Sequence, residues 1–120
     1  MFAVYRYQKD KMTSQIESQK GAYHLADSIS YQDGSVVSKT LVNKPSGTLT
    51  LFAFGKGQGL SEHTAPYDAQ VYVLDGKAEV SISGEWFPLT AGETILLPGD
   101  LPHAVKAVEA FKMLLIMIKA

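Results

Sequence analysis

Residues 70–83 read QVYVLDGKAEVSIS, and this stretch decides the fold. Its first part is rich in β-branched and aromatic side chains and ends at Asp75-Gly76, a dipeptide typical of two-residue β-hairpin turns. Its second part alternates apolar and polar side chains, which places Ala78, Val80 and Ile82 on one face. The stretch therefore predicts two antiparallel strands joined by a tight turn, with one face buried.

Further short strands are expected on both sides of this hairpin, separated by turns that contain Gly, Pro or Asp. Strands of this length at such spacing are typical of an all-β sandwich or barrel. A short helix is expected near the N-terminus, over residues 13–20 with Thr13 or Ser14 as its N-cap. The expected strands are Val36–Asn43, Thr48–Phe54, Gln70–Leu74, Lys77–Ser83, Trp86–Leu89, Thr94–Leu97 and Phe111–Ile118.

The composition is that of an ordinary globular protein with one domain. The chain has 120 residues, of which 46% are hydrophobic and 19% charged, with a formal net charge of −1. Because the basic residues form no stripe, neither nucleic acid nor an anionic membrane is an expected partner. There are no cysteines, so any metal would need imidazole, carboxylate, amide or water ligands.

The sequence also indicates where the protein resides. Residues 1–12, MFAVYRYQKDKM, lack the uninterrupted apolar core of a signal peptide. The longest apolar run, Met113–Ile118, is too short to cross a bilayer. A cytoplasmic location is therefore expected.

Two segments contain the candidate functional residues of the chain. Each has a glycine, a turn and a histidine that we expect to enter a new strand: the first runs from Gly57 to His63, the second from Gly92 to His103. The third histidine, His24, fits neither segment and is expected at the surface. Turn positions with unusual backbone dihedrals are predicted at four glycines: Gly57, Gly76, Gly92 and Gly99.

These segments resemble the two sequence motifs of the cupin superfamily. The first motif places a histidine after a glycine and five residues, as His63 follows Gly57. The second places a proline after a glycine and five residues and a histidine five positions further, as in Gly92, Pro98 and His103. Both motifs occur in the right order with strands around them, which makes the match specific.

The resemblance covers residues 57–107 and implies a double-stranded β-helix, the jelly-roll barrel of cupins. Residues 35–120 would form this barrel, and residues 1–34 would be an N-terminal segment packing on it. The expected strand at residues 111–118 is apolar on both faces. One face would be covered by the barrel interior, and the other by the N-terminal segment or a second subunit. Since cupins are frequently dimers through such outer strands, the resemblance implies a homodimer.

The chain departs from the family pattern at the metal ligands. The second histidine of the first motif is Ala65, and the glutamate position is either Ala69 or Gln70, depending on the direction of counting. Only His63 and His103 remain of the four usual ligands, with the amide oxygen of Gln70 as a poor third. Period-two alternation puts Ala69 and Gln70 on opposite faces of a strand. In the second motif the glycine after the proline is Asp100, and the final asparagine is Ala107.

Several residues near the motifs are candidates for the wall of a pocket around His63 and His103. Asp68 would serve as a ligand if its loop folds inward, and Tyr67 is either a wall or a rim residue. Aromatic residues of a small barrel line a ligand cavity or fill the core. The aromatic candidates are Tyr72, Phe52, Phe54 and Trp86.

Three functions fit these features. The retained histidines favour a metal-assisted enzyme, and the family resemblance implies iron, manganese, nickel or zinc and a dioxygenase or isomerase reaction. The small residues Ala65 and Ala69 favour a metal-free module whose histidines hydrogen-bond a sugar or an organic acid. A protein that acts through its barrel surface is the third, although no feature of the sequence demands it.

Overall fold

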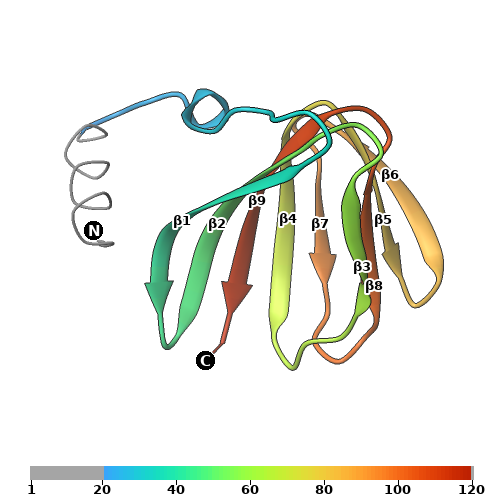
Figure 1. Cartoon of the computed structure of the whole chain (residues 1–120). Coiled ribbons are helices and arrows are strands. Elements are labelled where there is room, and N and C mark those ends of the chain that lie inside the picture. Colours follow the sequence, from blue (N-terminus) through green and yellow to red (C-terminus); the bar gives the residue numbers. More distant parts are fainter. Residues whose placement is uncertain (1–20, 120) are drawn as a thin grey trace.

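The computed structural model describes residues 21–119, and nine antiparallel strands in two sheets make up more than half of this part (Figure 1). One 3₁₀ turn, η1 (Leu25–Ser28), precedes them. The all-β barrel expected from the sequence is confirmed, whereas the helix expected over residues 13–20 lies outside the described residues. The strands are β1 (Val36–Lys44), β2 (Gly47–Phe54), β3 (Gly59–His63), β4 (Asp68–Asp75), β5 (Lys77–Ile82), β6 (Glu85–Thr90), β7 (Thr94–Leu97), β8 (His103–Ala107) and β9 (Phe111–Ile118).

The sheets are assembled from strands far apart in the chain. The larger sheet has the order β1-β2-β9-β4-β7, and the smaller has the order β3-β8-β5-β6. Strand β9 therefore pairs with both β2 and β4, and β8 pairs with both β3 and β5. These pairings, within each sheet, of strands that are not consecutive in the chain form the jelly-roll topology that the resemblance implied.

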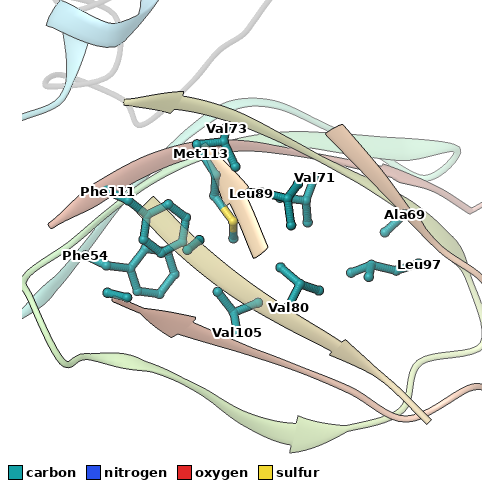
Figure 2. Packing of buried hydrophobic residues seen from close by; sticks show 12 residues of the cluster. Phe54, Ala69, Val71, Val73, Val80, Leu89, Leu97, Val105, Phe111 and Met113 are labelled. Atoms are coloured by element: carbon teal, nitrogen blue, oxygen red, sulfur yellow. The ribbon is translucent and has the colours of Figure 1, made fainter. Parts of the chain in front are cut away.

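The core lies between the sheets and follows the alternation of the expected hairpin. Val71 and Val73 of β4 are fully buried, and Val80 of β5 faces them from the other sheet (Figure 2). At one end of the core the rings of Phe54 and Phe111 stack, with centroids 4.6 Å apart and planes 3° from parallel. This stacked pair fills the end of the core where β2 ends and β9 begins.

Residues 21–34 pack on the outer face of the larger sheet. Ile29 is buried against Leu51 and Ala53 of β2. The Tyr31 hydroxyl donates a hydrogen bond to the carboxylate of Asp75 at the end of β4. The division at residue 34 stays a prediction, because residues 1–20 lie outside the described part.

The rest of that outer face carries exposed apolar side chains at Tyr72, Leu96 and Ile118. The packing of residues 21–34 covers only the half of the sheet around Leu51. The homodimer stays a prediction, with the uncovered half as the face on which it would form. In the chain between residues 21 and 119, no helix has the length and apolar character needed to span a membrane.

Candidate functional site

The two motif histidines meet on adjacent strands of the smaller sheet. His63 is the last residue of β3 and His103 is the first of β8, and the strand register pairs them directly. Their ring centroids lie 4.4 Å apart, with the planes at 70°. The expectation that each histidine enters a strand is correct for His103 and wrong for His63, which ends one, because β3 and β8 run antiparallel and meet at the same end of the sheet.

Both imidazoles are held in the same way by the backbone. The Nδ1 of His63 lies 2.7 Å from the carbonyl oxygen of Ser61, and the Nδ1 of His103 lies 3.2 Å from that of Leu101. A carbonyl oxygen can only accept a hydrogen bond, so each Nδ1 carries the proton. The Nε2 of each neutral ring therefore keeps its lone pair, and the site offers two neighbouring acceptors for a donor or a cation.

The histidines line a cavity whose other walls are almost entirely apolar. The space that the centre of a water molecule can occupy is about 50 Å³, enough for a few water-sized groups. Tyr67, in the loop between β3 and β4, is the third polar residue of the lining. The apolar wall consists of Leu60, Ala65, Ala69, Val71, Leu97, Val105, Met113, Leu115 and Met117.

The ambiguity between Ala69 and Gln70 is resolved by the pleat of β4. Ala69 is only 6% exposed and lines the cavity. Gln70 points to the opposite face of the sheet, where its Nε2 donates a hydrogen bond to Thr94 Oγ1 at 2.9 Å. The expected ligand Gln70 is therefore not part of the cavity wall, because adjacent strand residues face opposite sides.

The four aromatic candidates for the pocket wall are also corrected, since none of them lines the cavity and Trp86 is 48% exposed. Phe54 belongs to the stacked pair at the end of the core, and Phe52 stacks near it with ring centroids 5.8 Å apart. Both lie toward the opposite end of β2 from Gly47, which pairs with β9 near the cavity. Tyr72 shares the outer face with Gln70 and is exposed.

Asp68 supports the rim of the cavity and does not line it. Its Oδ1 accepts a hydrogen bond from the backbone N–H of Gly99 at 2.8 Å, and the N–H of Asp100 donates to the carbonyl of Ala65 at 2.8 Å. Asp100 has φ +68°, the left-handed conformation that its family counterpart, a glycine, adopts freely. The positive φ expected at Gly99 is thus found one residue later.

The environment of His103 favours its neutral form. The residue is 8% exposed. Desolvation lowers the pKa of the His103 imidazole below its usual value, and the charge of a protonated His63 lowers it further, against the opposing hydrogen bond to Leu101. His24, by contrast, is exposed, as the sequence predicted.

The donor set does not fit the metal centre that the resemblance implies. Among residues 21–119, no three side chains of the His, Cys, Asp or Glu type gather closely enough to hold a metal ion. The positions of the third histidine and the carboxylate are the cavity-lining Ala65 and Ala69. Two neutral imidazoles alone leave most of a divalent ion's coordination shell and all of its charge uncompensated.

The protein is thus a small β-barrel protein with two paired histidines at one end of its smaller sheet. Comparison with known proteins identifies the family to which it belongs. The family model for the cupin domain matches residues 50–119, more than half of the chain. The protein belongs to the cupin family.

Solved structures and curated sequences agree with this assignment. A conserved protein of unknown function, SPY1581 from Streptococcus pyogenes, is 37% identical with a TM-score of 0.81, over 84% of this chain and 89% of that one. A cupin 2 conserved barrel domain protein from Leptotrichia buccalis is 46% identical with a TM-score of 0.79, over 81% of this chain and 47% of that one. "Polyketide synthase CurC" of Streptomyces cyaneus is 35% identical over 75 residues, 62% of this chain and 49% of the relative. The chain spans about half the length of the curated relatives it matches.

The lowered pKa of His103 predicts a pH-dependent stability. An unfolded histidine titrates at about 6.5, so below that pH the unfolded chain binds more protons than the folded one. The free energy of unfolding should therefore fall as the pH drops below about 6.5, until the pKa of the folded state is passed. Urea denaturation between pH 8 and pH 5 measures this slope.

The variant His103→Gln does not titrate and should flatten the slope, whereas His24→Gln, at an exposed position, should leave it unchanged. Equal slopes for the wild-type chain and His103→Gln would contradict the assignment of a lowered pKa to His103.

Proposed function

We propose that the protein binds a compact, mainly apolar small molecule through a hydroxyl or enol group that donates a hydrogen bond to the imidazole of His63 or of His103. The observation that carries this proposal is the pair of Nδ1–carbonyl contacts at 2.7 and 3.2 Å, which leaves two Nε2 acceptors in an apolar wall. His63 is exposed at the mouth of the cavity, whereas His103 is only 8% exposed. A buried acceptor without a partner, such as the Nε2 of His103, costs about 1–3 kcal/mol, so a ligand that donates a hydrogen bond is preferred over one that does not.

The size and polarity of the cavity narrow the class of ligand. A sugar carries hydroxyls on every side, which the apolar wall could not satisfy. With about 50 Å³ for water-sized groups, the cavity encloses one end of a molecule and leaves the remainder at the mouth near Tyr67. A carbonyl compound that enolises, such as a β-diketone, combines small size, apolar flanks and one acidic O–H.

The name of one relative agrees with this ligand class. "Polyketide synthase CurC" is similar over 62% of this chain, and β-diketone units are the chemistry that polyketide synthesis generates. The neutral imidazole of His103 would also accept a proton from such a unit, which is the role of a general base.

The test uses 2,4-pentanedione with protein freed of metal by a chelator. Its enol should shift the imidazole ¹⁵N signals of His63 and His103 with a Kd of about 1 mM, equivalent to about −4 kcal/mol. 2-Pentanone, which lacks the enol hydroxyl, should bind about tenfold more weakly, the value of one hydrogen bond. His24 is exposed and serves as the internal control in the same spectrum.

Two variants complete this test. His63→Leu and His103→Leu keep an apolar side chain of similar bulk and should abolish the preference for the diketone over the ketone. Two results would contradict the proposal: equal affinities of the two compounds for the wild-type protein, or stoichiometric divalent metal in the purified protein by elemental analysis.

A further inference from the structure

We propose that the ion suited to this cavity is soft and monovalent, of the Cu(I) type, bound by the imidazoles of His63 and His103 and the thioether of Met117. The donor set does not fit the divalent centre of the family, and this mismatch is the starting point. The inference uses the cavity of the proposed function but not its organic ligand, so the two can fail separately.

The strand register places Met117 where a ligand is needed. Met117 of β9 is the direct partner of Ala69 on β4, and both line the cavity. Ala69 is the position at which the family pattern expects the carboxylate ligand. Met117 therefore lies beside the missing carboxylate, on the sheet that faces the histidines.

The other methionine of the cavity wall lies deeper. Met113 pairs with Val73 and is 1% exposed, within the packed core beside Phe111 (Figure 2). Its sulfur is surrounded by apolar side chains of the core, whereas Met117 lies four residues nearer the end of β9. Of the two, Met117 is the thioether that pairs with the position of the missing carboxylate, and it is the one proposed as a ligand.

The charge of the donor set selects the ion. Two neutral imidazoles and a thioether carry no negative charge, and the rest of the wall is apolar apart from Tyr67. The cost of moving an ion into such surroundings rises steeply with its charge, so a monovalent ion is much less penalised than a divalent one.

The chemical softness of the donor atoms also favours a soft monovalent ion. Thioether sulfur and imidazole nitrogen suit Cu(I), whereas hard ions such as Mn(II) require carboxylate and water oxygen. Cu(I) is also satisfied by two or three ligands, the number that His63, His103 and Met117 supply. No step of electron transfer is involved, since the ion binds and leaves in one oxidation state.

The experiment is an anaerobic titration of the full-length protein with Cu(I), in competition with the chromophoric chelator bicinchoninate. The substitution Met117→Leu keeps the volume of the side chain and should weaken Cu(I) binding at least tenfold, by analogy with the 10–100-fold losses seen around metal sites. Ile116→Leu is the control on the same strand and should change the affinity less than about threefold, because residue 116 pairs with Gln70, lies on the outer face of the sheet and leaves all three proposed ligands in place. X-ray absorption should show copper–sulfur scattering in the wild-type protein and not in Met117→Leu.

Several outcomes would overturn the inference. One is equal Cu(I) affinity of the wild-type protein and Met117→Leu, another is the absence of copper–sulfur scattering, and a third is Zn(II) binding as tight as that of Cu(I). The histidine ¹⁵N shifts with 2,4-pentanedione are measured on metal-free protein. If these persist while Cu(I) does not bind, only this inference fails, and if both are absent the cavity itself is not the binding site.

Discussion

Replacing Ala65 by His and Ala69 by Glu is expected to create a tight divalent-metal site, with the affinity for Zn(II) raised on the order of 10³-fold over the parent chain. Both alanines line the cavity beside His63 and His103, so the two new side chains would complete three imidazoles and one carboxylate. The carboxylate also supplies the negative charge that the parent cavity lacks. Calorimetry with Zn(II) and Ni(II) measures the gain.

The matched control moves the carboxylate by one residue. A chain with Ala65→His and Gln70→Glu gains the same two side chains, but position 70 faces the outer side of the sheet. Its affinity for Zn(II) should stay far below that of the Ala69→Glu chain. Equal affinities of the two double variants would show that the orientation of β4 assigned here is wrong.

Stability provides a second readout of the same design. A glutamate at a position that is 6% exposed should destabilise the metal-free chain, because burial penalises its charge. Bound metal should reverse this loss, by about 2.7 kcal/mol when the free metal is at 100 times its Kd. A melting temperature of the Ala69→Glu double variant that does not respond to Zn(II) would argue against a formed site.

Phe111→Ala should cost about 3–5 kcal/mol of folding free energy, the usual loss when a buried aromatic ring is removed. Phe111 is completely buried and stacks on Phe54 at 4.6 Å (Figure 2). Domains of this kind are stable by about 5–15 kcal/mol, so the loss is a large fraction of the total. Urea denaturation at pH 7.5, above the range in which His103 titrates, measures it.

Trp86→Ala is the control for this prediction, because Trp86 is also a large aromatic residue of a strand but is 48% exposed. Its loss should stay below about 1 kcal/mol, as for other surface substitutions. If the two variants lost the same free energy, the stacked pair of Phe54 and Phe111 would not be the main contributor to the core.

Alternation predicted most strands of the barrel well. The strand over residues 94–97 and the run at 111–118 were expected with the bounds that the structure has, and the turn at Asp75-Gly76 lies where its dipeptide predicted it. Strand β3 was not expected, because GLSEH has one large apolar side chain and lies at the edge of its sheet, where burial imposes no alternation.

The sequence predicted the two histidines of the site but not the side chains that line the rest of the cavity. Motif spacing brought His63 and His103 together, but spacing alone could not decide between Ala69 and Gln70, because the answer depends on the phase of one strand. Met117 was missed for a related reason: the run FKMLLIMI is apolar on both faces, so nothing in its pattern shows which side faces the cavity.

The pairing of β3 with β8 and of β9 with both β2 and β4 has a consequence for how the chain folds. The two imidazoles come from positions 63 and 103, and neither sheet is complete until segments far apart in sequence have met. Contacts between residues far apart in the sequence require loop closure, and the entropy lost in that step comes before the stabilising contact forms. Barrels with many such contacts therefore fold in milliseconds to seconds. The cavity around His63 and His103 is therefore expected to form only when both sheets have paired, late in the closure of the barrel.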